Sequence, residues 1–192
     1  RSFTTLYYLG ISHYGDEWFY GAQENLLLAY KKNPTDVNVL YYLAKSCARS
    51  SWKADGVAYM KMALDIATPK DSLITSLYDG LVECYRYYPK AAPYEYIEAV
   101  KKLYSLNKKY TLLYTIAGIY DGQKDYANAV HYYEKYMALV PKDKQVALDD
   151  EGRPLPDVDT LYQKARRRVE KIKAEDFFRN GAHDDYYEPK LI

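Results

Sequence analysis

A pattern of large and small residues recurs along this chain with a period of 34 residues. Its clearest copy consists of Leu113, Ile116, Ala117, Tyr120, Ala129, Tyr133 and Pro141. An earlier copy has the same spacing and consists of Leu6, Leu9, Gly10, His13, Ala22, Leu26 and Pro34. A further copy consists of Leu40, Leu43, Ala44, Cys47, Gly56, Met60 and Ala63, and its proline, Pro69, comes one residue late. Such a period indicates a repeat array, in which one repeat buries too little apolar surface alone and three or more must stack.

Each repeat is predicted to be a pair of antiparallel helices, because its apolar residues recur every three or four positions without strand alternation. Small residues stand where the two helices of a pair must approach closely. These positions are Gly10, Ala44 and Ala117 in the first helix, and Ala22, Gly56 and Ala129 in the second. Larger residues four positions later, such as Leu26 and Tyr133, lie on the same face and fill the space to the next repeat.

This spacing resembles the tetratricopeptide repeat pattern across residues 3–143. The resemblance implies an all-α fold, a right-handed solenoid of four helix pairs with a capping helix at its C-terminal end. The repeats are expected over residues 3–36, 37–70, 71–109 and 110–143. The resemblance also implies that the chain is a non-enzymatic scaffold or adaptor module. Such a module binds a protein or peptide, here of unknown identity, in a concave groove lined by the first helix of each repeat.

The third repeat departs from the pattern by five extra residues. Its first helix keeps an apolar stripe that includes Leu77 and Leu81, but Tyr78 or Val82 stands where the other repeats have a small residue. We therefore expect altered packing in this pair. The sequence PKAAP at residues 89–93 lengthens the turn, and we interpret it as an insertion tolerated in a surface loop, since such insertions cost little.

Beyond the repeats, residues 144–157 have the Gly, Pro and acidic composition of a connector. Residues 158–178 are expected to form an amphipathic capping helix, started by Asp157 or Asp159, with Val169 and Ile172 buried and Arg167 exposed. Residues 179–192 have no periodic pattern, and we expect them to be mobile unless they dock on a partner.

The resemblance places the following residues in the groove: Tyr7, Tyr8, Ile11, Tyr14, Asn38, Tyr41, Tyr42, Lys45, Arg49 and Tyr114, with Thr111, Thr115 and Asp121 beside the last. Tyrosines give large, stiff contact areas at little entropic cost. Lys45 and Arg49, one helical turn apart, are expected to be exposed, to hold a carboxylate of the ligand, and to contribute little to stability. The alternative is that some of these tyrosines pack between repeats or face solvent, because 25 of the 192 residues are tyrosine. Since Tyr7 and Ile11 stand where chaperone-binding repeats have Lys and Asn, tails of heat-shock chaperones are not the expected ligand.

The alternative to a peptide-binding scaffold is a regulatory or assembly domain. Such a domain would act by forming homo-oligomers through the outer face of its first repeat. The chain opens at Arg1 without a methionine, so we expect a trimmed or mature form, or the C-terminal part of a larger chain. It would be cytoplasmic, or extracytoplasmic if a signal segment was removed. No apolar run is long enough for a transmembrane segment.

The sequence offers no catalytic, metal-binding or cofactor-binding constellation. The three histidines lie in different segments, and carboxylates such as Asp79 and Glu83 have the spacing of solvated helix faces. The basic run KARRRVEKIK is interleaved with Glu170, and the net charge is only +1, so nucleic acid is not an expected partner. Cys47 and Cys84 sit on apolar helix faces and are expected to be free, buried thiols.

Overall fold

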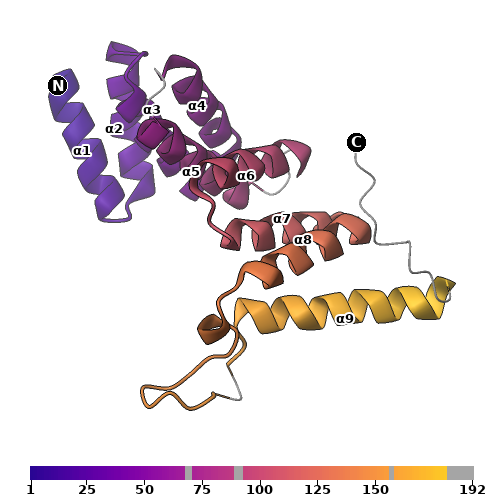
Figure 1. Ribbon diagram of the computed structural model, residues 1–192. Coiled ribbons are helices and arrows are strands. Elements are labelled where there is room, and N and C mark those ends of the chain that lie inside the picture. Colours follow the sequence, from indigo (N-terminus) through magenta and orange to yellow (C-terminus); the bar gives the residue numbers. More distant parts are fainter. Residues whose placement is uncertain (68–70, 89–92, 156–157, 181–192) are drawn as a thin grey trace. The chain divides into compact units, whose positions relative to one another are not determined.

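The computed structural model describes residues 1–67, 71–88, 93–155 and 158–180 (Figure 1). Nine α-helices and one short 3-10 helix form within these ranges. The helices are α1 (Phe3–Gly15), α2 (Phe19–Lys32), α3 (Val37–Arg49), α4 (Lys53–Ile66), α5 (Asp71–Tyr87), α6 (Pro93–Asn107), α7 (Thr111–Gly122), α8 (Tyr126–Leu139) and α9 (Leu161–Asn180). The chain divides into two compact units, Arg1–Asn107 and Lys108–Ile192.

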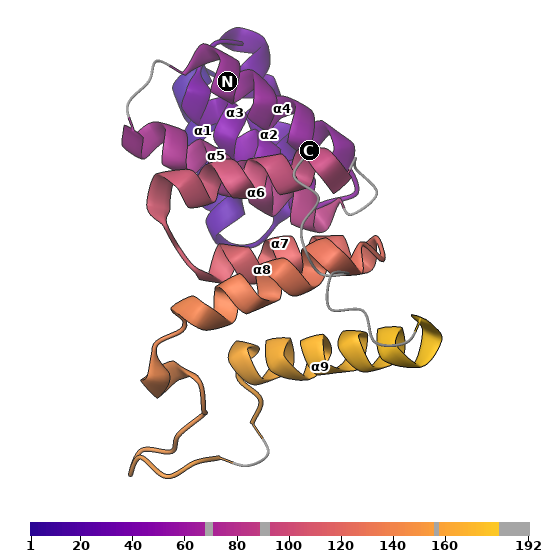
Figure 2. The same cartoon turned by 45° about the vertical axis from the view of Figure 1, so that its right-hand side comes forward.

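In the N-terminal unit the helices form three consecutive antiparallel pairs, α1 with α2, α3 with α4 and α5 with α6 (Figure 2). The helix α3 also packs directly against both α1 and α5, so these first helices make one layer. The core residues are the apolar positions of the repeat pattern: Leu26, Leu40, Leu43 and Met60 are fully buried. The periodicity of the sequence therefore identifies the core correctly.

The small residues of the pattern lie where paired helices approach most closely. A Cβ atom added to Gly56 on α4 would lie 2.8 Å from the carbonyl oxygen of Ala44 and 3.0 Å from the amide nitrogen of Ala48 on α3. Both atoms belong to the backbone of α3, so a change of side-chain rotamer cannot relieve the clash. The absence of a side chain at Gly56 is therefore what lets α3 and α4 meet at this distance.

The third pair is packed differently, as its sequence indicates. Tyr78 lies at the position that holds a small residue in the other repeats, and a pocket of about 590 Å³ opens beside it, lined also by Leu81 and Tyr85 of α5 and by Tyr94 and Ala99 of α6.

A different small residue brings α5 against its neighbours. Gly80 is the point where α5 approaches the preceding pair, since an added Cβ would lie 2.5 Å from the terminal methyl carbon of Met60 and 3.1 Å from the ring of Tyr41. In the third repeat the small residue is therefore Gly80, two residues after Tyr78, and it lies against the second repeat rather than against the partner helix of its own pair. The repeat pattern gave no indication of this role for Gly80.

The turn between the two helices of a pair has the same geometry in the first and the last pair. Glu17 and Lys124 both have a positive φ, of 58° and 62°. The next residue in each turn donates its N–H across the turn, from Trp18 to the carbonyl of His13 at 2.8 Å and from Asp125 to that of Tyr120 at 3.0 Å. The two turns are therefore equivalent by backbone conformation as well as by position in the repeat.

In the C-terminal unit, α7 pairs with α8, and α9 packs along α8 (Figure 2). Val169 and Ile172 of α9 are 6% and 2% exposed, whereas the side chain of Arg167 is 58% exposed, as the sequence predicts. The helix begins at Leu161 rather than at residue 158, and it continues to Asn180.

The expected caps of α9 are wrong, because Thr160 starts the helix. Its hydroxyl oxygen accepts from the N–H of Gln163 at 3.2 Å, and the side-chain oxygen of Gln163 accepts from the N–H of Thr160 at 2.9 Å. This reciprocal pair is a capping box. Asp159 instead pairs with Arg167, and Asp157 lies outside the described residues.

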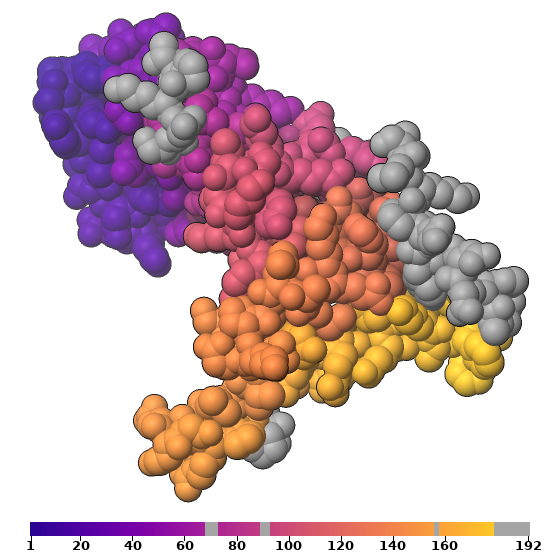
Figure 3. Space-filling model, viewed as in Figure 1, coloured from indigo at the N-terminus to yellow at the C-terminus, as the bar shows by residue number. Residues whose placement is uncertain are grey.

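The connector between α8 and α9 has local structure of its own within residues 142–155. A 3-10 turn (Lys142–Lys144) is followed by a short hairpin in which Leu148 and Pro154 form a β-bridge. The carboxylate of Asp149 closes the hairpin by accepting from the N–H groups of Glu151 and Arg153 at 3.0 and 2.8 Å. This segment protrudes from the C-terminal unit (Figure 3).

Two expectations concern residues outside the described ranges. The loop 89–93 is described only at Pro93, the first residue of α6. Of the tail 179–192, residues 179 and 180 belong to α9, and the remainder lies outside the described residues.

Candidate functional site

The layer formed by α1, α3 and α5 carries a group of aromatic rings that hold one another in place. Tyr42 on α3 packs edge-on against Tyr14 of α1 and against Tyr41, with ring centroids 5.6 and 5.2 Å apart. Tyr14 in turn packs edge-on against Phe19 at 5.7 Å. Edge-to-face contacts of this kind favour defined ring orientations, so each ring on this surface is held by its neighbours.

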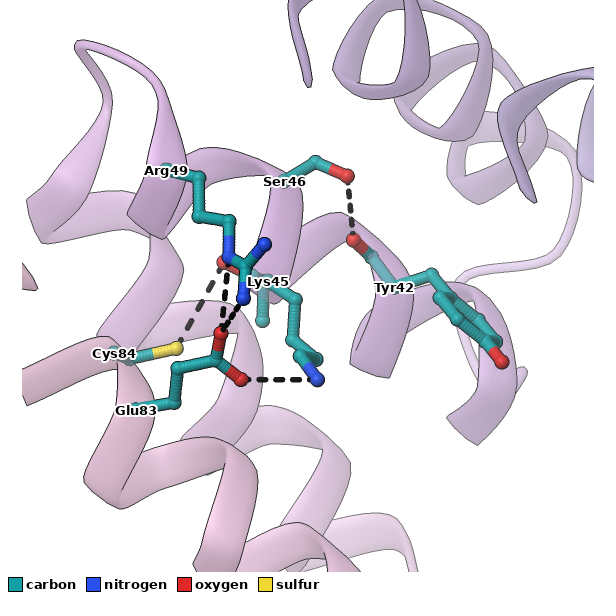
Figure 4. A network of polar contacts seen from close by, with 7 residues as sticks. Tyr42, Lys45, Ser46, Arg49, Glu83 and Cys84 are labelled. Atoms are coloured by element: carbon teal, nitrogen blue, oxygen red, sulfur yellow. Dashed lines mark hydrogen bonds and ion pairs between the residues drawn. The ribbon is translucent and has the colours of Figure 1, made fainter. Parts of the chain in front are cut away.

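Three charged side chains from α3 and α5 meet beside these rings (Figure 4). Arg49 donates two hydrogen bonds to Oε1 of Glu83, at 3.0 Å from Nε and 2.8 Å from Nη2. The ammonium of Lys45 lies 2.9 Å from the other carboxylate oxygen of Glu83, Oε2. Lys45 also lies over the rings of Tyr14 and Tyr41, at 5.6 and 5.3 Å from their centroids.

This ion cluster is partly withdrawn from solvent. The side chains of Lys45, Arg49 and Glu83 are 17%, 30% and 14% exposed. Burial raises the pKa of Glu83, but the hydrogen bonds and charges of Lys45 and Arg49 outweigh it, and the net pKa lies below its usual value. Burial lowers the pKa of Lys45, yet its bond to Glu83 leaves the net value raised. All three groups are therefore charged at neutral pH.

The position of Glu83 corrects two expectations. Glu83 is not a solvated carboxylate, and the basic pair is not exposed, because the carboxylate that Lys45 and Arg49 bind belongs to the neighbouring helix of the same chain. The stacking of α5 on α3 brings it there. The repeat period could have indicated this contact. Arg49 and Glu83 are 34 residues apart, so they occupy equivalent positions in the first helices of consecutive repeats.

A small pocket lies between α3 and α5 and has a volume of about 220 Å³. We call it the α3–α5 groove. It is lined by Val37, Asn38, Tyr41, Tyr42, Leu73, Ser76 and Leu77. The amide of Asn38 is exposed at its edge, and Leu77 is fully buried at its base. Three of the residues predicted from the sequence to bind a partner therefore line one concave surface.

The other predicted groove residues in the N-terminal unit lie outside this pocket. Tyr7 packs against the buried cores of the first two helix pairs and stacks on Phe3 with ring centroids 6.1 Å apart. Ile11 and Tyr14 are half-buried, whereas Tyr8 is 64% exposed next to Tyr7.

Tyr114 belongs to the C-terminal unit. It packs edge-on against Tyr133 and Tyr136 of α8, with centroids 5.5 and 5.4 Å apart. Its neighbour on α7, Asp121, is bound on both carboxylate oxygens by Arg168 of α9, at 2.6 and 2.7 Å. In this structure Asp121 therefore joins α9 to α7.

Most of the basic run on α9 is paired with carboxylates. Five of its six cations have such a partner: Arg166 with Glu170, Arg167 with Asp159, Arg168 with Asp121, Lys171 with Glu175 and Lys173 with Glu134. The run contributes to the attachment of α9 through Arg168 and Lys173, which the sequence did not predict.

Cys47 and Cys84 are free and buried, as predicted. Burial raises the pKa of each thiol to about 12, so both are protonated at neutral pH and unreactive. Among the residues that the structure describes, no group of three His, Cys, Asp or Glu side chains is placed to hold a metal ion. No helix within the described ranges is both long and apolar enough to cross a membrane.

No family model and no curated protein sequence matches this chain. Solved structures do resemble it. The crystal structure of MamA protein has 18% sequence identity and a TM-score of 0.60, and the match covers 94% of this chain and 96% of MamA. The structure of TTC0263, a thermophilic TPR protein in Thermus thermophilus, has 15% identity and a TM-score of 0.51, with 91% and 82% covered. At such identities the likeness concerns the fold alone, and the chain has the all-α solenoid fold of tetratricopeptide repeat proteins.

Proposed function

We propose that this chain is a non-enzymatic interaction module that binds an extended peptide segment of a partner protein at the α3–α5 groove. The observation that carries the proposal is the groove itself, in which packed tyrosine rings, an exposed amide and an apolar base converge. Its volume of about 220 Å³ is below the usual range of about 300 to 1,000 Å³ for small-molecule sites, which favours a side chain of a peptide over a whole cofactor.

The lining residues suit a peptide in extended conformation. Asn38 has both a donor and an acceptor, so it can pair with the N–H and C=O groups of a peptide backbone. Tyr41 and Tyr42 offer flat apolar surface with little rotamer entropy to lose, and Leu77 closes the base. Backbone pairing together with one apolar side chain in the pocket is a common mode of peptide recognition.

The ion cluster would support the groove rather than clamp the ligand. Lys45 and Arg49 are already paired with the carboxylate of Glu83, so they are not free to bind a carboxylate of the ligand. Their bonds to Glu83 join α3 to α5 along the edge of the groove. Two cations against one anion leave a net charge of +1. We therefore expect a mild preference for acidic peptides, weakened by salt.

Self-association through the first helix finds less support. Tyr8 is the one large apolar side chain of α1 that is mostly exposed, and its neighbours on the outer face include the hydroxyl residues Thr4, Thr5 and Ser12. A face of this composition has little apolar area to bury in a dimer. Light scattering after size exclusion, with parent and Tyr8→Ala side by side, would show whether the chain associates through α1.

The peptide proposal is tested with a random display library selected on the folded chain. Selected peptides are labelled, and their affinities for parent and Asn38→Ala are measured by fluorescence anisotropy. Because Asn38 is exposed, its loss leaves the core intact and should weaken binding about tenfold, the equivalent of about 1.4 kcal/mol. Tyr94→Ala, which removes a 73% exposed ring elsewhere on the same unit, should stay within twofold of the parent. Equal affinity of parent and Asn38→Ala would refute binding at the groove.

A further inference from the structure

The only two tryptophans of the chain occupy the same place in consecutive repeats. Trp18 is the N-cap residue of α2 and Trp52 is the N-cap residue of α4, 34 residues later. Their side chains are 57% and 52% exposed. Two large apolar side chains thus stand in solvent at equivalent turns, although the chain has buried positions for other aromatic residues.

These tryptophans replace residues that would stabilise the helices. At the equivalent position of the last pair, Asp125 accepts a hydrogen bond from the N–H of Asn128 at 3.2 Å and caps α8. The N-cap residues of α2 and α4 make no such side-chain bond. Both turns therefore lack a stabilising cap and also expose apolar surface. Trp18 does pack on the ring of His13, with centroids 4.4 Å apart, yet more than half of its side chain stays exposed. Positions that break two local rules at once are typical of binding sites.

The two turns form one continuous edge of the N-terminal unit. The hydroxyl of Tyr20, which is 59% exposed, lies 2.6 Å from the hydroxyl oxygen of Ser51 and joins the first turn to the second. A pocket of about 620 Å³ follows, lined by Ser51, Trp52, Lys53, Ala54, Asp55, Tyr87 and Tyr88. We call the surface formed by Trp18, Tyr20, Trp52 and Tyr87 the tryptophan edge.

The tryptophan edge is acidic. Asp16 and Glu17 precede Trp18, and Lys53 and Asp55 follow Trp52. All four are exposed, and none of them forms an ion pair with another described residue. Three carboxylates and one ammonium give the two tryptophan turns a net charge of −2, and the guanidinium of Arg49, 5.8 Å from the ring centroid of Tyr87, is already paired with Glu83. A partner for this surface therefore carries positive charge beside groups that pack on aromatic rings.

The spacing of the aromatic groups selects the conformation of that partner. Trp18 and Trp52 lie in equivalent turns, α3 packs directly on α1 and on α5, and packed helices lie about 8 to 10 Å apart, so we expect aromatic groups at about this interval along the edge. A polyproline II helix advances about 3.1 Å per residue with three residues per turn, or about 9 Å per turn. One face of such a helix would meet an aromatic group at every turn.

We infer that the tryptophan edge binds a proline-rich segment in the polyproline II conformation that carries arginine or lysine. Proline rings pack on exposed aromatic rings, and the segment is stiff before binding, so little entropy is lost. The indole N–H groups of Trp18 and Trp52 are donors for the free carbonyls of the polyproline backbone. The carboxylates of Asp16, Glu17 and Asp55 would receive the basic side chains. This surface is separate from the α3–α5 groove and does not depend on it.

The binding is measured directly by tryptophan emission, since both tryptophans lie at the proposed site. The probe is a decaproline peptide with two arginines at each end, and the controls are the same peptide with glutamates and a Gly/Ser peptide with the same arginines. We expect a saturable emission shift with the arginine decaproline, and at least tenfold weaker binding of both controls. If the Gly/Ser peptide binds as tightly as the arginine decaproline, charge alone explains the binding and the inference is overturned. The absence of a saturable emission shift with the arginine decaproline would also overturn it.

A variant distinguishes loss of the site from loss of the fold. Trp52→Ser supplies a capping hydroxyl, so its Tm should equal or exceed that of the parent while its affinity for a labelled arginine decaproline falls at least tenfold by anisotropy. Phe178→Ala, an 86% exposed ring in the other unit, should bind within twofold of the parent. Asn38→Ala should also bind normally, which separates this site from the groove. A stable Trp52→Ser that binds as the parent does would contradict the inference.

Discussion

Glu83 on α5 accepts two hydrogen bonds from Arg49 on α3, a residue one repeat earlier in the chain, at 3.0 and 2.8 Å. The pair shows how a repeat array places polar groups: equivalent positions of consecutive first helices become neighbours in space. A basic residue in one repeat and an acidic residue in the next then form a bond across the interface between repeats. Lys45 adds a third charge, and the cluster stiffens the layer that contains the groove.

Replacing Glu83 by Ala should destabilise the chain by about 1.5 to 3 kcal/mol, because it leaves two partly buried cations without their carboxylate. Urea unfolding monitored by circular dichroism gives the measurement. Glu134→Ala is the matched control: its ion pair with Lys173 is about half exposed, so its loss should cost less than about 0.5 kcal/mol. Equal losses in the two variants would show that the cluster does not hold α3 to α5.

The same cluster predicts a pH dependence. Although burial raises the pKa of Glu83, bonds to Lys45 and Arg49 leave it below the ordinary value of 4.5 in the folded chain. Its stabilisation is therefore complete above about pH 4.5 and is lost as the pH falls through the folded pKa, because the unfolded chain takes up the proton first. The stability of the parent minus that of Glu83→Gln, measured from pH 7 to pH 3, should decrease in this window. A difference independent of pH would contradict this assignment.

Two glycine-to-alanine substitutions should change the free energy of unfolding in opposite directions. Gly56→Ala introduces a Cβ 2.8 Å from a backbone oxygen of α3 and should destabilise by about 1 to 3 kcal/mol, despite the better helix propensity of alanine. Gly118→Ala lies in the exposed interior of α7, where the nearest atom is 4.0 Å away, and should stabilise by about 0.5 to 1 kcal/mol. Thermal unfolding compares them. A stable Gly56→Ala would mean that α3 and α4 do not approach closely at this point.

The attachment of α9 is tested at one buried and one exposed apolar residue of the same helix. Ile172 is 2% exposed and Phe178 is 86% exposed. Ile172→Ala should therefore cost about 2 to 4 kcal/mol, whereas Phe178→Ala should change the unfolding free energy by less than about 0.5 kcal/mol. If Ile172→Ala unfolds at the same urea concentration as the parent, α9 does not contribute to the fold of its unit.

The helix pairs and their cores were predictable because the same spacing returns in each copy. Small residues such as Ala129 and buried ones such as Ile172 follow from periodicity, and both are buried as predicted. The start of α9 was not predictable from composition. Three neighbouring polar residues could have capped it, and Thr160 does so because Gln163, three residues later, completes the reciprocal bonds.

The polar contacts were harder to predict, since they depend on which helices become neighbours. Glu83 looks like a solvated carboxylate along its own helix and Asp121 fits the groove pattern, yet each meets an arginine from another helix. The distance of 34 residues between Arg49 and Glu83 could have indicated the first pair. No period relates Asp121 to Arg168. Likewise, Tyr7 and Tyr114 fit the groove pattern, and their rings also pack on other side chains, Tyr7 on Phe3 of the same helix and Tyr114 on Tyr133 of α8.

The most direct measurement of the central claim is photocrosslinking from the α3–α5 groove. A photoreactive phenylalanine analogue replaces Val37 or Leu73, two lining residues from different helices, and in a control it replaces Phe178. Each protein is irradiated with a display-selected peptide, and adducts are identified by mass spectrometry. The account predicts adducts from positions 37 and 73, suppressed by excess unlabelled peptide, and none from position 178. Crosslinking only from position 178, or from all three positions equally, would contradict peptide binding at the groove.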